Sequence, residues 1–225
     1  MRKNFKENIV VFGGTFDPIH MGHLAVVDYT LRNNIASCVM LVPSGVPPFK
    51  ANRVSLSKEE RLYLCRLALI DYKNIYGSEY SDRVFINDYE LNSPTYSYTS
   101  ETIKHIKNTY MIEDKVNFII GDDIVDELPK WHDAQYLKNN VRFILFNRSD
   151  NKENAIKNLM DDGYDFFRVP NPTFEFSSSC VRGQKMYDML SPLVKEEYIS
   201  ILKQKGATFL ETAFPLTRYL KSSPK

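Results

Sequence analysis

Residues 13–23, which read GGTFDPIHMGH, hold the residue types best suited to chemistry. They follow the apolar run 9–12, which predicts a short buried strand. A turn with two glycines lets backbone pass close to a polyphosphate, and the start of a helix offers N–H groups and a partial positive charge to it. His20 and His23 stand three residues apart, so on the first turn of that helix they would share a face. The pattern predicts an enzyme that handles the α-phosphate of a nucleotide.

Six apolar runs predict the strands that would support such a site. They cover residues 9–12, 38–42, 83–86, 116–120, 142–146 and 166–169. Most are continuous apolar runs rather than alternating patterns, which is typical of parallel strands covered on both faces.

Helical patterns lie between these runs, over residues 22–33, 57–71, 97–108, 133–138 and 154–160, and a last one covers 193–205. Ser57 and Glu60 form a capping box at the start of the second pattern. Strands that alternate with helices predict an α/β fold, a Rossmann-like doubly wound, mostly parallel sheet with helices on both faces. Ligands of such sheets bind beyond the carboxyl ends of the strands, where residues 13–23 would lie with the proline-containing loops 43–50 and 170–172.

The composition narrows the class of protein. The 225 residues suit one domain, which we expect to span 1–206, followed by a tail, 207–225, of unknown role. A net charge of +1 argues against a protein built to coat nucleic acid. The chain has no apolar run long enough to span a membrane and no signal-peptide pattern, and its three cysteines are widely spaced. We therefore expect a cytoplasmic protein with no nucleic-acid or membrane partner.

The first motif resembles the GGTFDPxHxGH signature of the bacterial nicotinate-nucleotide adenylyltransferases, members of the HxGH nucleotidyltransferase superfamily. Five further segments are similar to motifs of that family and follow in the same order. They are 47–50 (PPFK), 90–91 with 97–99 (EL and SYT), 118–123 (FIIGDD), 129–132 (PKWH) and 177–182 (SSSCVR). A lone HxGH is weak evidence, but six ordered motifs are specific.

The resemblance implies a reaction. A phosphate oxygen of nicotinate mononucleotide would attack the α-phosphorus of ATP, giving deamido-NAD and pyrophosphate, with Mg²⁺ accompanying ATP rather than occupying a dedicated protein site. Because the attacking oxygen is already an anion, catalysis would consist of positioning and of stabilising charge on the phosphates.

The resemblance also assigns residues on the ATP side. His20 and His23 would donate hydrogen bonds to the α-phosphate, Lys50 would supply a mobile charge and Arg182 a planar fork for phosphate oxygens. The remaining ATP-binding residues would be Gly13, Gly14, Thr15, Phe16, Ser177, Ser178 and Ser179.

On the acceptor side, the resemblance implies that the ring of Trp131 stacks on the nicotinate ring. The start of the helix at Ser97, Tyr98 and Thr99 would bind the nicotinate carboxylate through backbone N–H groups. Asp123, in a loop after residues 118–121, would contact a ribose hydroxyl.

Plainer interpretations exist for several of these residues. Trp131 could only pack in the core, and the serine run 177–179 could only cap a helix. Asp17 is best interpreted as a turn or cap residue that hydrogen-bonds nearby backbone. His105 and His132 have no partner that the sequence identifies, so we assign both a structural role.

One departure bears on the activity, because Phe49 stands where the family has histidine. A phenylalanine cannot contact phosphate or ribose as histidine does. Alternative functions are therefore an adenylyltransferase that prefers nicotinamide mononucleotide and a nucleotide sensor that has lost catalysis. Pantetheine-directed relatives are shorter and lack the SYT and tryptophan segments.

Overall fold

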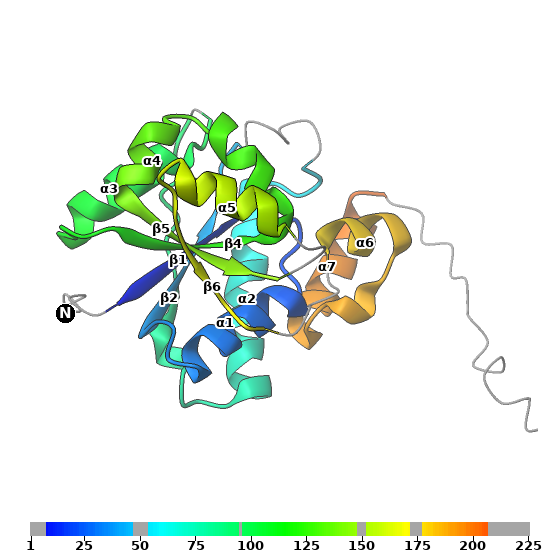
Figure 1. The fold of residues 1–225 in the computed structure, drawn as a ribbon. Coiled ribbons are helices and arrows are strands. Elements are labelled where there is room, and N and C mark those ends of the chain that lie inside the picture. The colour runs from blue at the N-terminus through cyan, green and yellow to red at the C-terminus, as the bar shows by residue number, and fades with distance from the viewer. Residues whose placement is uncertain (1–7, 47–53, 95, 148–151, 172–176, 207–225) are drawn as a thin grey trace, which may run out of the picture.

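The computed structural model describes residues 8–46, 54–94, 96–147, 152–171 and 177–206. Parallel strands form one sheet in the order β3-β2-β1-β4-β5-β6 (Figure 1). The strands are β1 (Ile9–Gly14), β2 (Cys38–Pro43), β3 (Val84–Ile86), β4 (Val116–Gly121), β5 (Val141–Phe146) and β6 (Asp165–Arg168). All six predicted strands are confirmed.

Helices cover both faces of this sheet (Figure 1). They are α1 (Met21–Arg32), α2 (Lys58–Tyr76), α3 (Thr99–Tyr110), α4 (Ala134–Asn140), α5 (Glu153–Asp161), α6 (Ser178–Gln184) and α7 (Pro192–Gln204). Short 3-10 helices cover η2 (Ser81–Arg83), η3 (Asp122–Lys130) and η4 (Tyr187–Met189). The predicted doubly wound α/β fold is therefore confirmed.

The continuous apolar strands predicted by the sequence face two cores. Val10 of β1 belongs to the core that α1, α2 and α7 cover, whereas Val11 belongs to the core that α3, α4 and η3 cover. The capping box at the start of α2 is also confirmed. The backbone N–H of Ser57 donates to Oε2 of Glu60 at 2.6 Å, and that of Glu60 donates to Oγ of Ser57 at 3.2 Å.

Several predicted boundaries shift by one to five residues, and the one at the end of β1 bears on the site. The sequence predicts that the first strand ends at residue 12 and that Gly13 and Gly14 form a turn. Instead β1 continues through both glycines, which pair with Val42 and Pro43 of β2. A residue without a side chain fits into a strand wherever neighbouring side chains need its space.

The strand order fixes where a ligand can bind. The chain moves outward from β1 to β2 and β3, then crosses back to β4 and continues to β5 and β6. The reversal between β1 and β4 is a topological switch point, and ligands of such sheets bind beside it at the carboxyl ends of the strands. At the switch point, β1 is followed by the loop into α1, and β4 is followed by η3.

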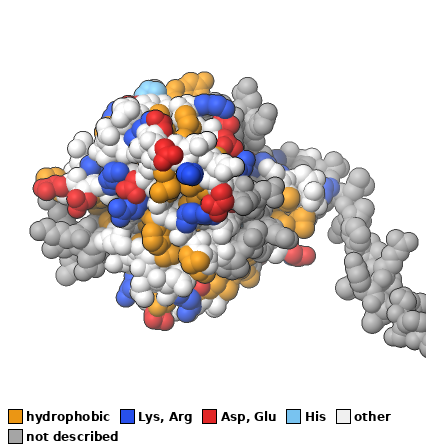
Figure 2. Space-filling view, in the orientation of Figure 1, with side chains coloured by type: hydrophobic (Ala, Val, Ile, Leu, Met, Phe, Trp, Pro, Cys, Tyr) orange, Lys and Arg blue, Asp and Glu red, His pale blue; other side chains and the backbone are white. Residues whose placement is uncertain are grey.

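The surface mixes both signs of charge. On the face in Figure 2, lysine and arginine side chains alternate with aspartate and glutamate. Ion pairs of the described residues include Arg142 with Asp165 at 3.2 Å and Lys138 with Asp162 at 2.6 Å. Within the described ranges, no helix is both long enough and apolar enough to cross a membrane.

Candidate active site

The histidine loop, residues 15–20, leads from β1 into α1. His20 is the N-cap of α1, and His23 lies in its first turn. Their rings stack with centroids 3.7 Å apart and an interplanar angle of 23°, so the prediction that they share a face is confirmed. The backbone N–H of His20 donates to Nδ1 of His23 at 3.1 Å. Since Nδ1 accepts, a neutral His23 carries its proton on Nε2 and can donate from there.

The glycines before this loop admit aromatic rings. A Cβ at Gly13 would lie 2.9 Å from Cζ of Phe118, and one at Gly14 would lie 2.9 Å from Cε1 of Phe16. Phe16 adopts the left-handed backbone conformation, with φ 48°. For a residue with a side chain, this conformation costs about 1–2 kcal/mol. The Phe16 ring meets that of His23 edge-on, with centroids 4.9 Å apart. Gly14 thus lets Phe16 pack against His23.

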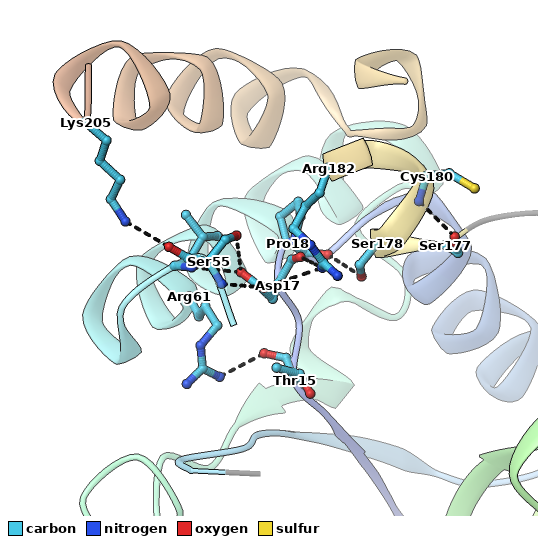
Figure 3. Close-up of polar contacts among 11 residues, drawn as sticks. Thr15, Asp17, Pro18, Ser55, Arg61, Ser177, Ser178, Cys180, Arg182 and Lys205 are labelled. Carbon is cyan, nitrogen blue, oxygen red and sulfur yellow. Dashed lines mark hydrogen bonds and ion pairs between the residues drawn. The ribbon is translucent and has the colours of Figure 1, made fainter. Parts of the chain in front are cut away.

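Asp17 is the polar junction of the histidine loop (Figure 3). It is 2% exposed, and its carboxylate accepts from the backbone N–H groups of Ser55 and Leu56 at 2.9 and 3.0 Å. The Ser55 hydroxyl donates at 3.0 Å, and Arg182 of α6 pairs with the carboxylate at 3.4 Å. The prediction that Asp17 bonds nearby backbone is wrong, because these partners lie 38, 39 and 165 residues away. Only the fold brings them together.

The serine run lies beside this junction (Figure 3). Ser177 is the N-cap of α6, and its Oγ accepts from the backbone N–H of Cys180 at 3.1 Å. The Ser178 hydroxyl donates to the carbonyl of Pro18 at 3.0 Å, and Ser179 is exposed. The cap interpretation is confirmed for Ser177, and the phosphate contacts of the three serines stay predictions.

The β2 loop, residues 44–46, connects this region to the start of α3. The backbone N–H of Gly45 donates to Oγ of Ser97 at 2.9 Å, and that of Ser97 donates to the carbonyl of Val46 at 2.9 Å. A Cβ at Gly45 would lie 2.1 Å from the carbonyl oxygen of Glu90. The chains approach so closely here that only glycine fits.

The predicted acceptor residues do lie at a helix start. Tyr98 is the N-cap of α3 and Thr99 its first residue. The Tyr98 ring stacks on His132, with centroids 4.2 Å apart, and Oγ of Ser100 lies 3.0 Å from Nδ1 of the same histidine. His132, which the sequence left without a partner, therefore joins the tryptophan segment to α3.

Trp131 follows η3 and is half-buried. Its ring meets those of Phe118 and Phe143 edge-on, at centroid distances of 6.3 and 6.4 Å. The packing interpretation is confirmed for this side of the ring, and stacking on a pyridine stays a prediction. Since a Cβ at Gly13 would lie 2.9 Å from Cζ of Phe118, Trp131 packs on a ring that lies beside the first motif.

The acidic pair after β4 lies in a different element from the one predicted. Residues 122 and 123 begin the 3-10 helix η3 and not a loop. Asp122 is 5% exposed whereas Asp123 is exposed. Asp123 is therefore the residue of the pair whose side chain reaches solvent, and its ribose contact stays a prediction.

Two buried charged residues near the β2 loop are Glu90, which the sequence placed in a motif without a role, and Arg61, which it did not single out. Glu90 accepts from the hydroxyl of Thr102 at 2.5 Å, and burial raises the pKa of its carboxyl. Arg61 of α2 is 1% exposed, and burial lowers the pKa of its guanidinium. The sequence places Arg61 on an amphipathic helix, where a charged side chain is normally solvated. The close approach of two loops that buries it has no local signature.

Phe49 and Lys50 lie outside the described residues. In the described part of the chain, no group of three or more His, Cys, Asp or Glu side chains could hold a metal ion. A divalent cation that enters with a nucleoside triphosphate is held largely by the phosphates themselves.

Comparison with known proteins identifies the relatives of this chain. Residues 11–184 match the cytidylyltransferase-like family. A "probable nicotinate-nucleotide adenylyltransferase" of Aliarcobacter butzleri is 32% identical over 88% of this chain and 98% of the relative. The chain belongs to the nicotinate-nucleotide adenylyltransferase family.

Other comparisons agree with this family. A "probable nicotinate-nucleotide adenylyltransferase" of Caldicellulosiruptor bescii is 31% identical over 88% of this chain and 97% of the relative. Among solved structures, the Plasmodium falciparum nicotinic acid mononucleotide adenylyltransferase complexed with NaAD superposes with a TM-score of 0.71. That alignment covers 87% of this chain and 96% of the other at 20% identity, so it bears on the fold alone.

Proposed function

We propose that this member of the nicotinate-nucleotide adenylyltransferase family transfers the adenylyl group of ATP to nicotinate mononucleotide, releasing pyrophosphate and deamido-NAD. The observation that carries the proposal is the stacked pair His20 and His23 at the start of α1. The pair stands at the switch point of the sheet, where a nucleotide phosphate is bound by helix N–H groups.

The chemistry needs charge stabilisation more than proton transfer. A phosphate oxygen of the mononucleotide attacks the α-phosphorus, and the bond from that phosphorus to the oxygen bridging to the β-phosphate breaks. Negative charge grows on the α-phosphate oxygens and on the departing pyrophosphate. His23 donates from Nε2, because its Nδ1 is held by the backbone of His20. His20 supports the orientation of that ring by stacking on it and acts on the same phosphate.

We assign the β- and γ-phosphates to the start of α6 and the histidine loop. Nη1 of Arg182 is bonded to Asp17, so its other two nitrogens are the donors for phosphate oxygens. Ser177, Ser178 and Ser179 add backbone N–H groups, and Lys50 supplies a further charge. Gly13, Gly14, Thr15 and Phe16 complete the ATP side.

We assign nicotinate mononucleotide to the opposite side of the switch point. The pyridine ring stacks on the side of Trp131 that does not pack on Phe118 and Phe143. Its carboxylate binds backbone N–H groups at residues 97–99, the start of α3, where the helix dipole favours an anion. Asp123 contacts the ribose.

Mg²⁺ enters with ATP as part of the substrate and neutralises phosphate charge. We assign it no protein ligands. We place the reaction in the cytoplasm, where the widely spaced cysteines Cys38, Cys65 and Cys180 stay as thiols.

The test is turnover of the purified chain with ATP, Mg²⁺ and either nicotinate or nicotinamide mononucleotide, measured as pyrophosphate and dinucleotide formed. We expect faster turnover, by kcat/KM, with the acid. Faster turnover with the amide would reassign the acceptor, and ATP binding without pyrophosphate release would show a nucleotide sensor.

A further inference from the structure

The guanidinium of Arg61 joins the histidine loop to the β2 loop, and Figure 3 shows its bond to Thr15. Nη1 donates to the carbonyl of Thr15 at 2.8 Å and to that of Ser44 at 2.6 Å, while Nη2 donates to the carbonyl of Gly45 at 3.0 Å. Thr15 begins the histidine loop, and Ser44 and Gly45 belong to the β2 loop. One side chain of α2 therefore donates hydrogen bonds to the backbone of both loops.

Burial of the charged Arg61 side chain costs free energy. It is 1% exposed, and none of the ion pairs between described residues includes it; its assigned acceptors are neutral carbonyls. A buried charge without a bonded counter-charge stabilises a fold less than an apolar side chain of similar volume. Stability alone therefore does not explain the residue. What a guanidinium offers, and an apolar side chain does not, is several donors in a rigid plane.

The bonds continue from Arg61 to the acceptor side. The N–H of Gly45, whose carbonyl Arg61 holds, donates to Oγ of Ser97 at 2.9 Å. Ser97 immediately precedes Tyr98, the N-cap of α3. In the other direction, Thr15 lies five residues before His20. A continuous set of hydrogen bonds thus runs from the histidine loop through Arg61 and Gly45 to the start of α3.

We propose that Arg61 is a positioning residue that holds the histidine loop and the start of α3 in fixed relation. The inference rests on the proposed function, in which the first binds the α-phosphate and the second binds the acceptor. Each substrate binds its own side, so Arg61 contributes little to either affinity. It contributes to the alignment of the attacking oxygen with the α-phosphorus, and a misplacement of about 1 Å there can cost about 100-fold in rate.

The kinetic test uses R61K, which keeps the charge but not the fork, with R66A as the control. Arg66 is an exposed arginine of the same helix. We expect R61K to fold, to lower kcat by about 10- to 100-fold, and to leave the dissociation constants of ATP alone and mononucleotide alone within about threefold of wild type. R66A should match wild type throughout. A folded R61K with wild-type kcat, or one whose loss lies wholly in one dissociation constant, would overturn the proposal.

A double variant separates positioning from a general loss of folded protein. S97A removes the acceptor of the Gly45 N–H and so breaks the same set of bonds at another point. If the bonds act as one unit, R61K/S97A should turn over within about twofold of the slower single variant. A double variant whose loss equals the product of the two single losses would contradict the proposal.

Hydrogen exchange tests the connection even if the chain proves inactive with both mononucleotides. The amide of Gly45 should exchange about 10-fold faster in R61K than in wild type, because the carbonyl beside it is no longer held. The same amide should be unchanged in R66A. Equal exchange in R61K and wild type would show that Arg61 does not hold the β2 loop, whatever reaction the protein catalyses.

Discussion

The segments that follow β1 and β4 leave the same edge of the sheet as neighbours, yet the fold holds them differently. After β1, the carboxylate of Asp17 accepts hydrogen bonds from residues 55 and 56 and pairs with Arg182. After β4, η3 buries Val125 and Leu128 completely, and Trp131 packs on two phenylalanine rings.

The difference concerns what each side must do. Hydrogen bonds depend on direction, so they suit a segment whose atoms must meet a reacting phosphate in the proposed reaction. Apolar packing depends on volume and tolerates exchange of similar side chains. We therefore expect small polar changes after β1 to have large effects, whereas effects after β4 should follow the size and shape of the side chain.

The largest effect should come from the histidine pair. In the proposed reaction H20A and H23A each remove a group that stabilises charge on the α-phosphate, and the loss of such a donor costs about 100-fold or more in kcat. Pyrophosphate release measures it, with H105A as the control, because His105 stacks on Tyr89 outside the site. Near-normal turnover would show that the pair is structural.

The next effect should be on stability, at Asp17. D17N keeps the shape of the side chain but places an amide against donors, which leaves a buried N–H without an acceptor. We expect a loss of about 2 kcal/mol in the free energy of unfolding, measured by denaturant titration. D188N is the matched control, because the Asp188 side chain is 97% exposed in its ion pair with Lys195 and should change stability little. Equal losses in both variants would contradict the distinction.

A smaller effect is expected at Trp131. W131A should raise the KM of the mononucleotide by about 10-fold, since a stacking contact is worth about 1–1.5 kcal/mol, and leave the KM of ATP unchanged. W131F, which keeps an aromatic face, should recover most of the loss. If W131F were as impaired as W131A, size and shape would not explain this side of the site.

The smallest effect concerns pH. Burial raises the pKa of Glu90 above its ordinary 4.5, so the folded state holds the proton to higher pH than the unfolded state. The stability that Glu90 contributes is full below its unfolded pKa and falls as pH rises through the folded pKa. E90Q should lack that fall in denaturant titrations at acid and neutral pH, whereas E101Q, at a partly exposed residue, should keep it. Parallel curves for wild type and E90Q would rule this out.

The fold could be predicted from the sequence because the patterns that indicate strands and helix starts involve residues close together in the chain. Apolar runs marked all six strands, and the pair Ser57 and Glu60 marked the start of α2. The glycines misled, since Gly13 and Gly14 were interpreted as a turn. Their role depends on the rings of Phe118 and Phe16, and the first of these lies about a hundred residues further along the chain.

For the site, the sequence predicted local features but not what holds them in place. The histidines share a face and Tyr98 and Thr99 lie at the start of α3, as predicted, whereas the ligand contacts of these residues stay predictions. The roles of Asp17 and Arg61 could not be predicted, because their partners come from loops that only the folded sheet brings together. Asp17 looked like a turn residue, and no sequence pattern singled out Arg61.

The contacts of Asp17 and Pro18 also set when the site can form during synthesis. Their partners Arg182 and Ser178 lie 165 and 160 residues later in the chain. During synthesis the histidine loop thus leaves the ribosome at least 160 residues before those contacts can form. Contacts so distant in sequence slow folding. An arrested chain that ends before α6 would carry both histidines but lack the contacts that Arg182 and Ser178 make with their loop.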